Sequence, residues 1–264
     1  MEQKKSLVYH QETLDFIHEQ PTVSEQAIEI LNQLEQKRGC TLPASVREWY
    51  SLKRSAVMLS KHSDGQAIDV EHLGAVNHYW SEGRYHEIDL FPKGLLPFLV
   101  ENHGSCTWAI HLNGWADPPV FVSVDNMTPS AVWQPCADMF SEFLYSCVWD
   151  HQIISSDEKV FGWTPQLTSV ERAFLQETFQ EGPRIYHFPG RVNLRFFSGS
   201  QHILIQEGSH QTSWYFLAAS DEELKQLIEK VQRFETLKQN LHLERNGLTE
   251  WEDMFPDDSR WSEE

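Results

Sequence analysis

The sequence predicts an α+β protein, with an antiparallel sheet flanked by helices in its first half and a second, smaller α+β unit after it. Helical apolar patterns with capping residues occur in both halves, and strand-like runs broken by turn formers stand between them. A length of 264 residues favours two domains. Apolar residues make up 40% of the chain and charged residues 23%, a mixture that can bury a core and differs from that of disordered chains.

Two helices are predicted after a polar lead-in at residues 1–21. Thr22 and Glu25 have the spacing of a capping box, in which each side chain satisfies a free N–H of the first turn. Gly39 is placed to end this helix in a left-handed conformation, and Pro43 suits the first position of the next one. The apolar residues at helical spacing are Ala27, Ile28, Leu31 and Leu34 in the first helix and Val46, Trp49 and Tyr50 in the second.

The sheet of the first domain is predicted between residues 55 and 124. Residues 55–85 carry a weak pattern, so we expect an irregular connection with one or two edge strands there. Turn formers at residues 113–118 and an apolar run at 119–124 predict a hairpin with the preceding strand. That strand carries the clearest alternation, typical of one buried face, at Cys106, Trp108, Ile110 and Leu112.

A helical stripe from Met139 to Val148 would cover one face of this sheet and complete a first domain at residues 22–153. The polar residues 155–159 form a suitable boundary. A second domain is expected at residues 160–240, and an acidic tail that contains aromatic residues at 241–264.

The second domain is predicted to contain a helix, a four-stranded meander and a further helix. Thr168 with Glu171 and Ser220 with Glu223 repeat the capping-box spacing, and Gly182 is the expected end of the first helix. The strand-like runs are 184–188, 192–197, 202–206 and 213–218. The predicted apolar faces are Val170, Phe174, Leu175 and Phe179 in one helix and Leu224, Leu227, Ile228 and Val231 in the other.

The charge of the chain argues against a nucleic-acid partner. With 21 basic and 39 acidic residues, the formal net charge is -18, which repels a phosphate backbone. The same field would speed the encounter with a basic protein, although an acidic surface also serves solubility alone. No apolar stretch is long enough to cross a membrane, and the first residues do not resemble a signal peptide, so we expect a cytoplasmic protein.

The common signatures of enzymes are missing from the sequence: it has no dinucleotide or phosphate-binding glycine motif, no nucleophile elbow and no H-E-x-x-H. His103 and Cys106 would lie on opposite faces of an extended segment, which disfavours a Cys–His nucleophile. The four cysteines have no zinc or redox spacing. An N-terminal group with loose helical spacing, His10, Glu12, Asp15 and His18, lacks a second ligand cluster. We therefore expect no catalytic residue, metal or cofactor.

Residues 22–153 resemble the SUKH superfamily. The segment 31–50, with a helix, the Gly39 stop, Leu42-Pro43 and a short helix ending in aromatic residues, is similar to the opening of these domains. The later segments 101–104, 106–110 and 117–120 are similar to their central strands. The resemblance implies a SUKH-like α+β domain without catalytic residues that recognises proteins, as in bacterial toxin-immunity proteins and a yeast regulator of cell-wall synthesis.

The sequence thus favours a non-catalytic immunity protein that binds a cognate toxin, and a basic toxin domain is one candidate partner. The alternative is an intracellular scaffold or regulator of the cell-wall type; a third reading is a small enzyme in the second half. From loop position and chemistry, the predicted partner-binding residues are Glu101, His103, Trp115 and Asp117. The competing interpretation is that these residues only fix the hairpin. Trp115 in particular is either folded back or offered to a partner.

Overall fold

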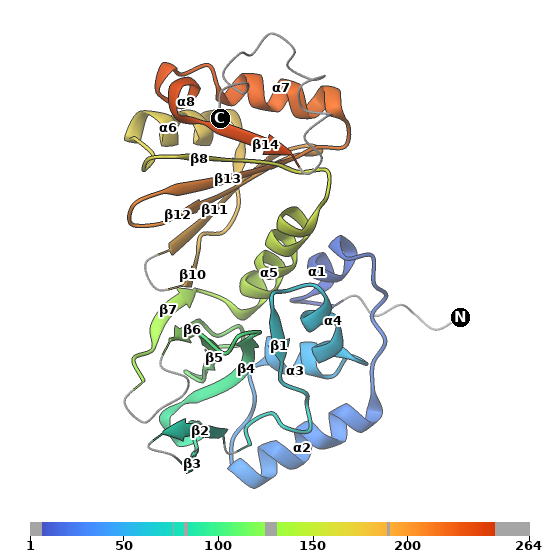
Figure 1. Cartoon of the computed structure of the whole chain (residues 1–264). Coiled ribbons are helices and arrows are strands. Elements are labelled where there is room, and N and C mark those ends of the chain that lie inside the picture. The colour runs from blue at the N-terminus through green and yellow to red at the C-terminus, as the bar shows by residue number, and fades with distance from the viewer. Residues whose placement is uncertain (1–6, 76, 82–83, 125–130, 189–190, 246–264) are drawn as a thin grey trace, which may run out of the picture. The chain divides into compact units, whose positions relative to one another are not determined.

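The computed structural model describes residues 7–75, 77–81, 84–124, 131–188 and 191–245 (Figure 1). It has the predicted α+β fold, with antiparallel sheets and flanking helices. The chain divides into two compact units. The first comprises residues 1–151 and 185–189, and the second comprises residues 152–184 and 190–264.

The first unit is built on a five-stranded antiparallel sheet in the order β1-β4-β5-β6-β7. Apolar side chains of the sheet and of α1, α3, α4 and α5 form one core. The β2–β3 hairpin pairs separately. The strands are β1 (Gly65–Ala67), β2 (Asn77–Ser81), β3 (Arg84–Ile88), β4 (Leu95–Glu101), β5 (Thr107–His111), β6 (Val120–Ser123) and β7 (Gln134–Ala137). The helices are α1 (Gln11–Phe16), α2 (Glu25–Arg38), α3 (Ala44–Tyr50), α4 (Ser55–Lys61) and α5 (Phe140–Ser155), with a short 3-10 turn η1 (Phe91–Lys93).

The first helix pair forms as the sequence predicts, except at its start. The N-cap of α2 is Ser24, whose hydroxyl accepts the N–H of Ala27, so the predicted capping role of Thr22 is wrong. Gly39 ends α2 in the left-handed region at φ 64°. The lead-in is also more structured than its polar sequence suggests, because α1 places Leu14 in the core of the first unit.

Strand β5 is buried on both faces rather than one. Trp108 and Ile110 belong to the main core, whereas Ala109 packs in a second cluster with Ile88, Leu90 and Leu95. The weakly patterned stretch before it contains the helix α4 in addition to strands. This helix is difficult to recognise in the sequence because its N-cap residue, Arg54, makes no side-chain capping hydrogen bond.

The second unit contains an antiparallel sheet with the order β11-β12-β13-β8-β14, and β9 pairs with β11. Side chains from α6, α7 and α8 pack with one face of this sheet to form its core. The elements are β8 (Val160–Thr164), α6 (Ser169–Thr178), β9 (Gln180–Glu181), β11 (Arg191–Ser198), β12 (Gln201–Glu207), β13 (Thr212–Leu217), α7 (Asp221–Val231), α8 (Glu235–Asn240) and β14 (His242–Arg245).

The helices of this unit follow their sequence signals closely. Thr168 and Glu171 form the predicted reciprocal capping box of α6, and Ser220 caps α7. Val170 is 63% exposed, because Glu171 occupies the core side of the first turn. The helix ends at Thr178, before the predicted stop at Gly182, since β9 begins at once.

Three strands of the second sheet, β8, β9 and β14, were not predicted. β8 lies between β13 and β14, and β14 falls within the predicted acidic tail. The rest of that tail, residues 246–264, lies outside the described residues. The predicted strand at 184–188 forms as β10 (Ile185–Phe188), and in the sheet order it stands next to β11, as the predicted four-stranded meander requires. β10 also lies beside β7, and Ile185 joins the core of the first unit, to which residues 185–189 are assigned.

Candidate functional site

The four predicted partner-binding residues lie in two separate turns of the first unit. Glu101 and His103 belong to the β4–β5 turn, and Trp115 and Asp117 belong to the β5–β6 connection. These turns stand at opposite ends of β5, a strand of five residues that spans about 17 Å. The structure therefore brings the residues together in pairs and does not join them into one site.

Glu101 holds the β4–β5 turn in place. One of its carboxylate oxygens accepts hydrogen bonds from the N–H of His103 at 2.8 Å, the N–H of Ser105 at 3.1 Å and the hydroxyl of Ser105 at 2.9 Å. Desolvation opposes ionisation of Glu101, but these hydrogen bonds outweigh it and lower the pKa below its ordinary value. The residue is only 7% exposed, so its main contact is with its own turn. His103 is exposed.

Asp117 anchors the β5–β6 connection to the start of α5. Its carboxylate accepts a hydrogen bond from the N–H of Ser141 at 3.1 Å and a second from the Ser141 hydroxyl. The N–H groups of a helix's first turn have no partner within the helix, so a carboxylate at this position satisfies one of them. Asp117 thus links the β5–β6 connection to α5, two parts of the first unit that are distant in the sequence.

Trp115 is exposed to solvent, and the backbone on both sides of it is hydrogen-bonded. Its side chain is 62% exposed, while its own N–H donates to Asn113 Oδ1 at 3.1 Å. The carbonyl of Ala116 accepts the N–H of Ser45, at the start of α3, at 2.9 Å. With Asp117 bound to Ser141, the backbone around the indole has fixed partners before any ligand arrives. Of the two alternatives for Trp115, the structure shows the exposed one.

Two carboxylates and one apolar side chain stand at the start of α5, which is joined to Asp117 of this loop. Burial, together with the nearby charges of Asp138 and Asp117, raises the pKa of Glu142 above its ordinary value. Met139 lies between Asp138 and the first residue of α5 and is partly exposed. We call the set Trp115, Asp117, Asp138, Met139 and Glu142 the Trp115 surface.

Sequence reasoning did not assign Asp138, Met139 or Glu142 to a site. The available signal was their place at the start of a strongly predicted helix, where acidic residues are common for reasons of helix stability alone. Glu142 interacts with the charge of Asp117, and the hydrogen bonds between Asp117 and Ser141, which are 24 positions apart, hold these two segments together.

Cys106 lies fully buried at the start of β5. Burial, followed by the charges of Glu101 and Asp64, raises its pKa to about 12, so the group is a neutral thiol at pH 7. Cys106 therefore packs in the core of the first unit as a neutral thiol.

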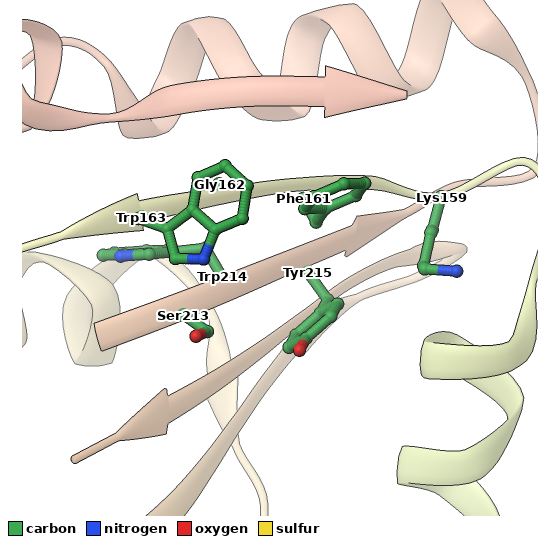
Figure 2. Close-up of a pocket in the computed structure, with 7 residues that line it drawn as sticks. All are labelled: Lys159, Phe161, Gly162, Trp163, Ser213, Trp214 and Tyr215. Carbon is green, nitrogen blue, oxygen red and sulfur yellow. The ribbon is translucent and has the colours of Figure 1, made fainter. Parts of the chain in front are cut away.

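The second unit has a hollow of its own on the sheet face formed by β8 and β13 (Figure 2). Its volume is about 300 Å³. We call it the β8–β13 hollow; its lining residues are Lys159, Phe161, Gly162, Trp163, Ser213, Trp214 and Tyr215. None of these is a histidine or a carboxylate. The hollow therefore does not supply an acid–base pair for the third hypothesis, a small enzyme in the second half of the chain.

Two searches within the described residues found nothing further. No group of three or more His, Cys, Asp or Glu side chains there could hold a metal ion. Among the helices of the same part of the chain, none combines the length and the apolar character needed to cross a membrane.

Comparison with known proteins found no match: no family model, no curated protein and no solved structure is similar enough to this chain to be significant.

Proposed function

We propose that this chain is a non-catalytic cytoplasmic binding protein of the immunity type, which neutralises a cognate toxin by direct binding through the Trp115 surface. One observation carries the proposal: a tryptophan that is 62% exposed stands on a loop whose neighbouring backbone groups are already hydrogen-bonded. Solvent exposure of so large an apolar side chain has a cost that a partner's pocket would remove.

The held loop favours tight binding because less conformational freedom is lost on association. Truncating a buried interface tryptophan to alanine often costs about 2 kcal/mol or more of binding free energy. If the loop that carries it had to become ordered on binding, the lost conformational entropy would reduce the affinity that the tryptophan provides. The contacts of Trp115, Ala116 and Asp117 within the first unit remove most of this ordering in advance.

The acidic residues of the Trp115 surface favour a basic partner. Asp138 and Glu142 place negative charge near Asp117, two residues from Trp115. Burial is the main cause of the raised pKa of Glu142, and repulsion from Asp138 and Asp117, which a cationic partner would relieve, adds to it. The whole chain carries a net charge of -18, which attracts a basic protein over a longer range and accelerates the encounter. A basic toxin domain with an apolar pocket next to Lys or Arg side chains would fit.

The resemblance of residues 22–153 to SUKH domains supports the immunity role over other kinds of protein binding. The Trp115 surface would also serve the alternative function, an intracellular scaffold of the cell-wall-regulator type. The two functions differ in their partner, so the identity of the protein that binds in a Trp115-dependent way decides between them.

The test is co-expression with each candidate toxin encoded next to this gene in its native genome. The native chain should rescue growth and form a complex, and Trp115→Ala should weaken that complex by tenfold or more without changing the thermal unfolding midpoint. Tyr186→Ala is the matched control, since Tyr186 is also an exposed aromatic residue of the first unit, at 51%.

Absence of both protection and a complex would contradict the immunity role. A complex that survives Trp115→Ala unchanged would instead contradict the surface. If Trp115-dependent binding is found only to housekeeping proteins, the scaffold function replaces the immunity function.

A further inference from the structure

The β8–β13 hollow contains three aromatic rings on the sheet face opposite the helices of the second unit. In β8 and β13, buried residues alternate with half-buried ones, as expected when only one face carries the core. Antiparallel pairing sets Phe161 opposite Tyr215 and Trp163 opposite Ser213 on the half-buried face. Figure 2 shows these side chains projecting from the same side of the two strands.

The two rings from β8 form a corner rather than a stack. The centroids of Phe161 and Trp163 lie 5.3 Å apart, and their planes meet at 88°. An edge-to-face pair of this kind leaves the face of one ring free, and free aromatic faces bind other flat rings by offset stacking. The hollow is therefore shaped for a flat ligand.

Lys159 gives the hollow a positive end. It comes directly before β8, two residues before Phe161 and four before Trp163, and it lines the hollow with them. Its ammonium group donates one hydrogen bond to the carbonyl of Ser156 at 2.9 Å, which restrains it and leaves two further donors. The lining contains no carboxylate to neutralise it.

The neighbouring strand β14 limits how much negative charge a ligand can carry. His242 pairs across from Trp163, and Glu244 pairs across from Phe161, so both stand on the face that carries the hollow. The Glu244 carboxylate would repel a second anionic group of the ligand near Phe161. A single anionic group bound at Lys159 would not face this repulsion.

We propose that the β8–β13 hollow binds a small molecule that carries one flat unsaturated ring system and one anionic group. The ring lies against Trp163 and Phe161, and the anion accepts hydrogen bonds from Lys159. The hydroxyls of Ser213 and Tyr215 are placed for polar substituents of the ring. A volume of about 300 Å³ is at the small end of natural ligand sites and matches one fused ring with a short substituent.

A pair of fluorescent probes separates the two parts of this proposal. 8-Anilinonaphthalene-1-sulfonate carries a flat naphthalene ring, an anilino ring and one sulfonate, and N-phenyl-1-naphthylamine is the same ring system without the sulfonate. Titrated into the full chain, the sulfonate should bind saturably at one site and more tightly than the neutral probe. Lys159→Gln should weaken sulfonate binding about tenfold, as expected for the loss of one charge-assisted hydrogen bond, and leave the neutral probe unaffected.

Trp163→Ala should weaken both probes about tenfold, because both use the stacking surface. Lys238→Gln on α8 and Trp115→Ala in the first unit are the matched controls for charge and for an exposed indole, and neither should change binding. Lys159→Gln removes only a partly exposed charge, so it tests the site even if Trp163→Ala fails to fold.

The proposal is overturned if the sulfonate shows no saturable binding, or if Lys159→Gln binds it as tightly as the native chain. Equal binding of the sulfonate to a folded Trp163→Ala variant overturns it as well. These titrations involve no protein partner and no residue of the Trp115 surface except as a control, so their outcome is independent of the immunity function.

Discussion

Asp117 receives both the backbone N–H and the hydroxyl of Ser141, and so ties the loop that carries Trp115 to the first turn of α5. The residue that the sequence predicts at an interface therefore has a clear structural task. Under the proposed function, its effect on binding would be indirect, through the position of Trp115.

Asp117→Ala should destabilise the first unit by about 1 kcal/mol, because it leaves an N–H of the first turn of α5 without its carboxylate partner. Urea unfolding followed by circular dichroism measures this change. Asp157→Ala is the control, since Asp157 is an exposed carboxylate of the polar boundary segment. An unchanged unfolding midpoint for Asp117→Ala would show that the anchor contributes nothing to stability.

The carboxylate of Glu101 should stabilise the fold only while it is ionised. Its pKa in the folded chain is lowered below the ordinary 4.5, so the unfolded chain binds the proton first as the pH falls. The stabilisation is complete above about pH 4.5 and is lost as the pH falls through the folded pKa. Glu101→Gln should therefore be less stable than the native chain at pH 7, with a smaller difference at pH 3.5. A difference that grows in acid would contradict this assignment.

His10 should make the fold sensitive to mild acid. Its Nε2–H donates to the carbonyl of Ser45 at 2.9 Å, while Nδ1 is buried without a hydrogen-bond partner in the described structure. Burial lowers its pKa below 6.5, so the folded chain holds it neutral and the unfolded chain takes up the proton first. Stability is then lost as the pH falls below about 6.5, by at most about 1.4 kcal/mol per pH unit for one group.

His10→Gln keeps a donor for Ser45 and does not titrate, so the loss of stability between pH 7.5 and 5.5 should be smaller in this variant. Urea midpoints at four pH values within that range measure the slope. His62, His151 and His202 also have lowered pKa values, so the variant should retain part of the pH dependence of stability. Parallel slopes for the native chain and the variant would exclude His10 as a contributor.

Gly162→Ala should destabilise the second unit by about 1–3 kcal/mol. A Cβ atom at this position would lie 2.2 Å from the carbonyl oxygen of His242, so β14 could not keep its pairing with β8. The matched control is Gly182→Ala, where the nearest heavy atom would be 3.4 Å away. Hydrogen exchange of the β14 amides should rise in Gly162→Ala alone; unchanged protection would mean that the strand adapts.

Local signals account for what the sequence predicts correctly. The capping box at Thr168, the serine cap at Ser220 and the left-handed Gly39 act within a few residues of their own positions, so they can be recognised in one dimension. The strands 192–197, 202–206 and 213–218 are long, alternate clearly and are separated by turn formers. Their meander follows from short connections.

The errors come from contacts between distant parts of the chain. β8 has only five residues, including Gly162, and becomes a central strand because β13 and β14 pair with it from either side. The second buried face of β5 depends on Ile88 and Leu90. The same holds for the site: Trp115 could be selected from its loop, but Glu142 could not, because a hydrogen bond across the fold joins its helix to Asp117.

The strand β10 gives the chain an unusual order of assembly. Ile185 belongs to the core of the first unit, yet it follows residues 152–184, which belong to the second. A ribosome that has released residues 1–153 has therefore not yet supplied every part of the first core. An expression boundary placed there would produce a fragment that lacks Ile185 of its own core, and vectorial folding of the first unit is completed only when synthesis has passed residue 188.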